Sequence, residues 1–523
     1  MRVGTGVSGR LIALLAALAA LALGATGAQA AQSCTGPGDG DWERATPAQA
    51  GMDAEKLQAA LDYGSSQQSF AVRVYRHGCL VGEDRAAPAN RTQTFQSWSM
   101  AKSVTALVFM RAMTQRLISP EDPLGSLITE ADRAHGAITM RNLLTMTSGL
   151  RWNGFRDYDI FMPDRLREAL TVPIDKPRGE YYEYSQSGPA LLAESVQRAV
   201  GEDFQAYAQR ELFSPLGIEP GSWSWGRDQA GHTQGFFDLK MTPDDYARLG
   251  ELLRRGGTWR GKRLIARRIV GRSVRPTFTN GCYGWMIWVN AAKPCVSPRV
   301  QERPVSDARE FPELPADMYR FAGLFGQLVV VFPSQGVVLV RTGQEGNPGG
   351  FAGGGDYQNE LFKRVLGAIT DQKITPPGDA PDEGMVRRDD VDRGFQTSVF
   401  EPEAYFGGFS PPPLPPAGPG RARALILEQA SRRVQRRWRV PVRTHCPRLA
   451  PAACAGKVRM KRAGSKKIKL APGATRMLWF SIPPKARPKR GKRLRTKVFS
   501  VNPDAAGGTL ATLPLALRPP RKR

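Results

Sequence analysis

The 523-residue chain is organised around one stretch, Phe95-Gln-Ser-Trp-Ser-Met-Ala-Lys-Ser-Val-Thr-Ala-Leu-Val-Phe-Met110. After Ser99 the run is apolar and contains neither glycine nor proline, which predicts a buried helix that begins near this serine. Positions i and i+3 share a helix face, so Lys102 is within reach of the Ser99 hydroxyl. A serine at a helix N-terminus also lies beside unbonded backbone N–H groups and the positive end of the helix dipole. These features suit a nucleophile that has to carry an oxyanion.

The N-terminus has the features of a secretory signal peptide over residues 1–30. Arg2 and Arg10 supply positive charge, residues 11–23 form a short apolar core, and Ala28-Gln-Ala30 fits a cleavage site. The apolar run is too short to span a bilayer, and no later segment is long and apolar enough. We therefore expect a secreted or cell-envelope protein with no transmembrane segment in its mature chain.

The six cysteines would then fold in an oxidising compartment, where disulfides persist. Their order along the chain favours three local pairs, although six cysteines allow many pairings. The expected pairs are Cys34–Cys79, Cys282–Cys295 and Cys446–Cys454. No C-x-x-C or Cys/His cluster has the spacing of metal ligands, so we expect neither a metal site nor a cofactor.

The net charge of +26 is unevenly distributed along the chain. Residues 421–523 carry 29 Lys or Arg against 2 Asp or Glu, whereas residues 31–420 carry 43 against 46. The basic character therefore belongs to the C-terminal part of the chain and does not describe the part that contains Ser99.

Strand patterns occur near both ends of the first large segment, residues 31–371, with helical patterns between them. Apolar, alternating stretches occupy residues 70–82, 284–289, 323–333 and 336–341. Helical patterns occupy residues 53–65, 139–149, 242–250 and 356–369. This order predicts an α/β domain with one antiparallel sheet built from both ends of the segment, flanking helices and a helical insertion.

A proline-rich linker is predicted over residues 372–420, because Pro411–Gly420 is rich in proline and favours polyproline geometry. Beyond it, short strand-like segments separated by Gly and Pro turns predict a small all-β domain over residues 421–523 with a disordered basic tail. Those segments are residues 439–443, 457–461, 476–481 and 494–500.

Six motifs in this order resemble those of the β-lactamase-related serine hydrolases, which include class C β-lactamases, D-Ala-D-Ala carboxypeptidases and esterases. The details are most similar to the 6-aminohexanoate-dimer hydrolase branch, and the resemblance spans about residues 50 to 370. The motifs are Trp98-Ser-Met-Ala-Lys-Ser103, Leu143-Leu-Thr-Met-Thr-Ser-Gly149, Tyr184-Ser-Gln186, Pro215-Leu-Gly217, Thr242-Pro-Asp-Asp-Tyr-Ala-Arg248 and Gly323-Leu-Phe-Gly-Gln327.

The resemblance implies catalytic roles for Ser99, Lys102 and Tyr184. Ser99 would form an acyl-enzyme, Lys102 would take its proton, and Tyr184 would relay a proton to the leaving group. Lys102 must be neutral to act as a base, whereas a free lysine has a pKa of about 10.4. Burial and a helix N-terminus both disfavour the ammonium form. The alternative for Lys102 is a structural lysine held in an ion pair.

Two positions depart from the family pattern. Gln186 stands where the family's Y-x-N motif has asparagine, and its longer amide would contact a substrate carbonyl or the lysine. The cation of the family's K-T-G triad is replaced in Phe321-Ala-Gly323. Its loss argues against efficient recognition of β-lactams or D-Ala-D-Ala peptides. Gly323 would let substrate approach the strand, and the backbone N–H of Leu324 would join that of Ser99 in the oxyanion hole.

Residues 150–160 would line the acyl pocket. Trp152 and Tyr158 are candidates for stacking on the substrate, with Asp157 or Asp159 contacting an amine. Loop packing and solvent-facing charge are an equally good interpretation of these four residues.

The sequence thus predicts an exported serine hydrolase that acts on a small-molecule amide or ester. The alternatives are a catalytically silent surface-binding protein with the same fold, and a true β-lactamase or carboxypeptidase. The basic residues 421–523 either aid solubility or attach to an anionic cell-envelope polymer. Few aromatic residues lie among their basic runs, so we expect no specific nucleic-acid binding.

Overall fold

A computed structural model describes residues 31–37, 40–152, 156–157, 159–296, 305–344 and 356–380 of the first part. In the C-terminal part it describes residues 426–429, 438–445, 454–461, 463–471, 474–487, 494–501 and 509–517. Among these residues no helix has the length and apolar character needed to cross a membrane.

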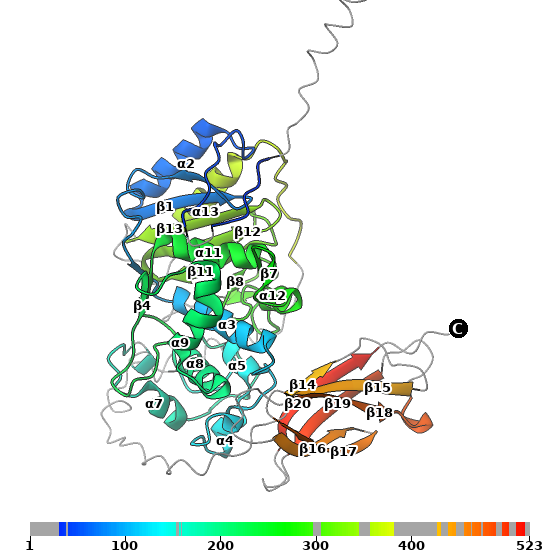
Figure 1. Ribbon diagram of the computed structural model, residues 1–523. Coiled ribbons are helices and arrows are strands. Elements are labelled where there is room, and N and C mark those ends of the chain that lie inside the picture. The colour runs from blue at the N-terminus through cyan, green and yellow to red at the C-terminus, as the bar shows by residue number, and fades with distance from the viewer. Residues whose placement is uncertain are drawn as a thin grey trace, which may run out of the picture.

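The first part is built on a six-stranded antiparallel sheet with strand order β2-β1-β13-β12-β11-β8 (Figure 1). The first strand pairs with the last, in a register that runs from Ala71 opposite Thr342 to Arg76 opposite Val337. This pairing confirms the predicted sheet assembled from both ends of the segment. The six strands are β1 (Ser69–Arg76), β2 (Cys79–Glu83), β8 (Trp288–Val289), β11 (Tyr319–Gly323), β12 (Gln327–Phe332) and β13 (Val337–Gly343).

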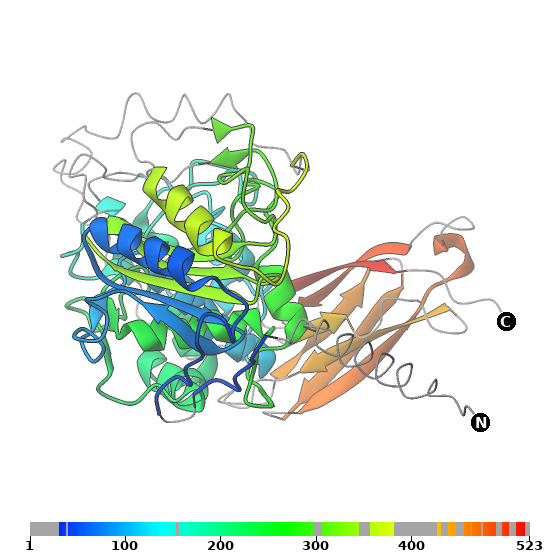
Figure 2. The ribbon, with the colours of Figure 1, turned by 90° about the horizontal axis from the view of Figure 1, so that it is seen from above.

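Helices cover both faces of the sheet because successive side chains of a strand point to opposite faces. In β12, Leu328, Val330 and Phe332 are buried in the core formed with α2 (Ala54–Ser66) and α13 (Asp356–Gly367). Figure 2 shows these two helices lying side by side over one face of the sheet. The alternate residues Val329 and Val331 join the larger core that contains α3 (Met100–Thr114) and α11 (Pro243–Arg254).

The remaining elements of the first part form the insertion between β2 and β8, and small hairpins around it. The helices are α4 (Arg133–Gly136), α5 (Met140–Leu144), α7 (Arg165–Thr171), α8 (Ser187–Val200), α9 (Phe204–Ala208), α10 (Ser214–Leu216) and α12 (Arg267–Ser273). The strands are β3 (Phe95–Gln96), β4 (Trp223–Trp225), β5 (Leu239–Met241), β6 (Thr258–Trp259), β7 (Lys262–Arg263), β9 (Cys295–Val296) and β10 (Val305–Ser306).

Local chemistry explains two differences from the predicted boundaries. The helix expected over residues 139–149 ends at Leu144, where the Thr145 hydroxyl bonds back to Arg141 O and Met146 takes a positive φ of 55°. The single strand expected over residues 323–333 is interrupted, because Phe325 and Gly326 take φ values of 60° and 73°. Side-chain-to-backbone bonds and left-handed residues both compete with regular structure.

Two of the three expected disulfides are present among the described residues. Cys34 bonds to Cys79 and Cys282 bonds to Cys295, with Cα–Cα distances of 5.1 and 5.0 Å. The first bond joins the N-terminal segment to the start of β2. Cys446 lies outside the described residues, so its pairing with Cys454 stays a prediction.

The C-terminal part is all-β, as predicted, and consists of two antiparallel sheets. One has the order β14-β15-β18 and the other β17-β16-β19-β20. Val440, Leu478, Val458 and Ile468, drawn from both sheets, belong to a single apolar core. The strands are β14 (Ile426–Gln429), β15 (Arg439–His445), β16 (Cys454–Met460), β17 (Gly464–Leu470), β18 (Thr475–Ser481), β19 (Leu494–Val501) and β20 (Thr509–Leu517).

The contact between α11 and the sheet depends on a glycine. A methyl group at Gly250 would lie 2.7 Å from a Val329 methyl and 3.0 Å from a Val338 methyl. We expect Gly250→Ala to destabilise the fold by about 1–3 kcal/mol through overpacking, measured by urea unfolding. Gly271→Ala is the matched control, because this helical glycine is exposed and a methyl group there meets nothing within 4 Å. The control should be neutral or slightly stabilising, and equal losses in both variants would contradict the packing argument.

Candidate active site

The nucleophile candidate lies at the N-cap of α3, directly after a sharp turn. Trp98 takes a positive φ of 46°, and Ser99 then opens the helix with its side chain partly exposed. Lys102 is one turn further, and its Nζ lies 2.9 Å from Ser99 Oγ. The i, i+3 spacing in the sequence therefore corresponds to a direct hydrogen bond between the two side chains.

Lys102 is 1% exposed, and its other contacts are poor substitutes for water. Its Nζ donates to Phe236 O at 3.2 Å and lies 4.7 Å from the centroid of the Tyr184 ring. Burial lowers the pKa of Lys102 well below its usual value of 10.5, while the negative charge of Asp157 acts in the opposite direction. Desolvation is the larger effect, which favours the neutral amine that a general base requires.

Tyr184 precedes α8 and packs edge-to-face on Tyr283, with a ring-centroid distance of 6.3 Å. Its ring also lies 6.0 Å from that of Trp288 on β8. Burial raises the pKa of Tyr184 to about 12, and a hydrogen bond with the Ser99 side chain partly offsets this effect. The hydroxyl is therefore protonated at neutral pH and in contact with the serine. The motifs in the sequence pointed to Tyr184 but not to Tyr283 or Trp288, which hold its ring in place.

The end of β11 lies against the turn that precedes the candidate nucleophile. A methyl group on Gly323 would lie 2.2 Å from Ser97 O and 3.2 Å from the Trp98 Cβ. Only glycine permits this approach, which places the start of the Leu324–Gly326 turn against the two residues before Ser99. Within this turn, Phe325 is exposed and packs edge-to-face on Trp98 at 5.3 Å. The Phe321 side chain, in contrast, is fully buried in the core.

Gln186 is the residue before α8 and is 3% exposed. Its backbone N–H donates to Asp157 Oδ1 at 3.1 Å. Its side-chain Oε1 is buried and has no hydrogen-bond partner among the described residues. A buried amide oxygen without a partner is costly, so this atom is available to a ligand donor.

Asp157 belongs to a buried ionic cluster that the sequence alone did not reveal. It is 1% exposed and pairs with Arg156 at 3.2 Å, and Arg156 in turn pairs with Glu168 at 2.7 Å. Burial raises the pKa of Glu168 to about 7, although the guanidinium groups of Arg156 and Arg165 oppose this. Arg156 and Asp157 precede α7, whereas Arg165 and Glu168 belong to it, so no short motif in the sequence joins the two pairs.

Of the other pocket candidates, Trp152 is 7% exposed and lies in the described part of the loop. Tyr158 lies outside the described residues, so its role stays a prediction. Asp159 is partly exposed, and its Oδ1 accepts a hydrogen bond from the Phe161 backbone at 2.9 Å. Across the described ranges, no three His, Cys, Asp or Glu side chains gather in a position to hold a metal ion.

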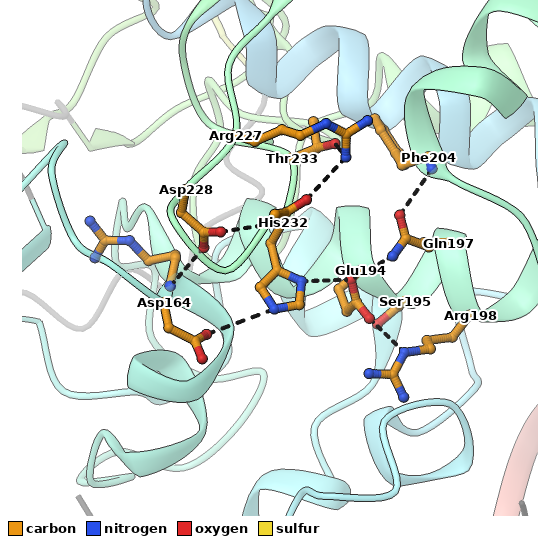
Figure 3. A network of polar contacts seen from close by, with 12 residues as sticks. Asp164, Glu194, Ser195, Gln197, Arg198, Phe204, Arg227, Asp228, His232 and Thr233 are labelled. Carbon is orange, nitrogen blue, oxygen red and sulfur yellow. Dashed lines mark hydrogen bonds and ion pairs between the residues drawn. The ribbon is translucent and has the colours of Figure 1, made fainter.

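A second polar network holds the segment that presents Phe236 O to Lys102. His232 lies at its centre, with Nδ1 3.1 Å from Glu194 Oε2 and Nε2 3.8 Å from Asp164 Oδ1 (Figure 3). The His232 backbone N–H donates to Asp228 Oδ1 at 2.8 Å. The hydrogen bond to Glu194 is the largest effect on the pKa of His232, which is raised above 6.5. This histidine thus ties the segment to α8.

One class of serine hydrolases, the serine β-lactamases and penicillin-binding proteins, has a serine and a lysine one helical turn apart, as here. Comparison with family models gives the same class of protein. Residues 55–361, more than half of the chain, match the family model described as Beta-lactamase. The chain belongs to the β-lactamase family, whose members are serine hydrolases. No curated protein sequence matches the chain.

The solved structures that match this chain are distant in sequence. A protein assigned as a 6-aminohexanoate-dimer hydrolase from Bacillus anthracis is 16% identical with a TM-score of 0.49, over 63% of this chain and 87% of that one. A β-lactamase from Mycobacterium bovis is 18% identical, with a TM-score of 0.43, over 60% and 99%. A penicillin-binding protein homologue from Caulobacter crescentus is 16% identical, with a TM-score of 0.45, over 61% and 99%.

The His232 network predicts a pH-dependent stability. Because the folded-state pKa of His232 is raised, its contribution is fully present below the unfolded pKa of about 6.5 and is lost as pH rises through the folded value. We expect His232→Gln to lower the free energy of unfolding by about 1.5 kcal/mol at pH 6, measured in urea, and by clearly less at pH 9. The facing groups that set this balance are Glu194, Asp164 and Asp228. An equal loss at both pH values would assign His232 a packing role only.

Proposed function

We propose that the protein is an exported serine hydrolase that cleaves an amide or ester through an acyl-enzyme on Ser99. The observation that carries the proposal is the 2.9 Å contact between Ser99 Oγ and a buried Lys102 whose pKa is lowered. A structural lysine in an ion pair would have a raised pKa and a carboxylate in contact with it. Lys102 has neither: among the described residues its polar contacts are a hydroxyl and a backbone carbonyl.

In the proposed reaction, Ser99 Oγ attacks the acyl carbon while its proton passes to the neutral Lys102 amine. The oxyanion that forms is stabilised by the backbone N–H groups of Ser99 and Leu324. The C–N or C–O bond then breaks, and the Tyr184 hydroxyl delivers a proton to the leaving group, regaining one from Lys102. Water attacks the acyl-enzyme with the same groups acting in reverse, which releases the acid and restores Ser99.

The rim of the site favours an uncharged group beside the reacting carbonyl. Trp98 and the exposed Phe325 form an aromatic pair next to Ser99. Phe321, which stands where the K-T-G triad of the family has its cation, is a buried apolar residue. No cation from this triplet can hold a substrate carboxylate. Short esters and linear amides therefore fit better than β-lactams or D-Ala-D-Ala peptides. The likeness to the 6-aminohexanoate-dimer hydrolase branch supports a linear amide as one substrate class.

Export is supported by the leader-like residues 1–30 and by two disulfides, which persist in oxidising compartments. The domain limits expected from the sequence, 31–371 for the hydrolase, 372–420 for the linker and 421–523 for the basic module, are part of this proposal.

The test is hydrolysis of a short-chain p-nitrophenyl ester, with intact mass recorded on the quenched reaction. We expect turnover and an acyl adduct that are both lost in Ser99→Ala. Lys102→Met should lower kcat by about 10²–10⁴-fold, because it removes the general base. Lys262→Met is the matched control at an exposed lysine and should leave kcat unchanged. A folded protein with neither turnover nor adduct would instead indicate a silent binding protein.

The pH profile gives a second, independent test of Lys102. Activity should fall as pH decreases through the lowered pKa of Lys102, because the amine is then protonated. Asp157 raises that pKa, so Asp157→Asn should move the acid limb of kcat/KM to lower pH. Glu180→Gln, at an exposed carboxylate, serves as the control and should leave the limb in place. A limb that moves to higher pH in Asp157→Asn would contradict the assignment of the base.

A further inference from the structure

The hairpin of β16 and β17 carries a concentrated positive charge on its exposed side chains. Lys457 and Arg459 on β16 are exposed, as are Lys466, Lys467 and Lys469 on β17. The apolar residues of the same hairpin, Val458, Met460, Ile468 and Leu470, are buried in the module's core. The hairpin therefore presents cations to solvent while its apolar residues hold the two sheets together.

Four of these cations share one face of the hairpin, and two of them are directly opposed. Lys457 is opposite Lys467 in the antiparallel register, and Ala455 and Ser465 occupy the places opposite Lys469 and Arg459. Lys466 is opposite the buried Val458 and therefore belongs to the other face. Like charges at directly opposed positions destabilise a sheet. The sequence of residues 421–523 contains only two acidic residues, Glu428 and Asp504, and neither belongs to this hairpin. The opposed positive charges therefore lower the stability of the isolated module, and a bound polyanion would offset their repulsion.

Protection of a sheet edge does not explain the whole set. Lysines on an edge strand prevent pairing with other chains, and β17 is the edge strand of its sheet. This accounts for Lys466, Lys467 and Lys469. β16, however, is paired on both sides, with β17 and with β19, yet it carries Lys457 and Arg459.

We propose that this face binds a linear anionic cell-envelope polymer whose backbone carries phosphodiesters and no bases. Three of the four cations on this face are lysines, which act as point charges and contact phosphates without fixed geometry. Exposed residues on adjacent strands form a flat, multivalent surface, which suits a flexible chain. The proposal rests on the export proposed above and is independent of hydrolytic activity.

The composition of the hairpin argues against two other anionic partners. Single-stranded nucleic acid is held by bases stacked on aromatic side chains, and β16 and β17 contain no aromatic residue. An amphipathic helix binds a membrane surface by inserting apolar side chains, whereas those of this hairpin are buried in the core.

The test compares the full-length protein with two quadruple variants that each lose four positive charges. One replaces Lys457, Arg459, Lys467 and Lys469 by Gln. The matched control replaces Lys262, Arg263, Arg267 and Arg268 by Gln, a set of adjacent exposed cations in the first domain. Binding to a synthetic poly(glycerol phosphate) is measured by fluorescence anisotropy at several salt concentrations, with ester hydrolysis and the unfolding midpoint recorded alongside.

We expect the hairpin variant to lose affinity and salt dependence together. Removing four phosphate contacts should reduce the log–log salt slope by about 2.8, so the wild type weakens about 50-fold more than the variant between 50 and 200 mM salt. The control variant should keep the wild-type slope. The unfolding midpoint of the hairpin variant should stay the same or rise, because opposed like charges are removed.

Two results would overturn the proposal. One is a hairpin variant that is folded and binds the polymer with the affinity and salt slope of the control variant. The other is single-stranded DNA that competes more than threefold better than the polymer at equal phosphate concentration, since that preference requires base stacking. Loss of ester hydrolysis with unchanged polymer binding bears on the hydrolase proposal alone.

Discussion

The contact between Ser99 and Lys102 depends on the exclusion of water from the Lys102 amine. An amine that is 1% exposed and bonded to a serine hydroxyl and a carbonyl has lost most of its hydration, which favours the neutral form. The surroundings that exclude water come from distant parts of the chain. Phe236 belongs to the segment tied down by His232, and Tyr184 is held between Tyr283 and Trp288. The site is therefore a property of the assembled insertion rather than of α3 alone.

The sheet supplies the other half of the site. β11 is placed by its pairing with β12 and β8, and its last residue, Gly323, lies against Ser97. β12 in turn pairs with β13, which pairs with β1. The position of the turn beside the candidate nucleophile is thus fixed by strands from both ends of the domain. A small shift of α11, which packs on β12 and β13 through Gly250, would be passed to this turn.

The particular residues show how far reasoning from sequence could go. A helix beginning near Ser99, strand structure within residues 70–82 and a helix within residues 242–250 follow from short-range rules, and the structure contains all three. The break between β11 and β12 did not follow, because a left-handed Phe325 has no sequence signature. The sequence leaves Asp157 as either a contact to a substrate amine or a packed loop residue, and the structure buries it against Gln186 N because residues far apart in sequence pack around it.

The sequence by itself determined the alternating and helical patterns, the S-x-x-K pair, the family resemblance and the concentration of positive charge after residue 420. Each depends on residue types at short spacing, where backbone geometry leaves few choices. Only the tertiary structure decided that Lys102 is buried away from water and that the charge of Asp157 acts on its pKa. The same holds for the pairing of Lys457 opposite Lys467. Burial and cross-strand register are set by contacts between distant segments, and no local pattern encodes them.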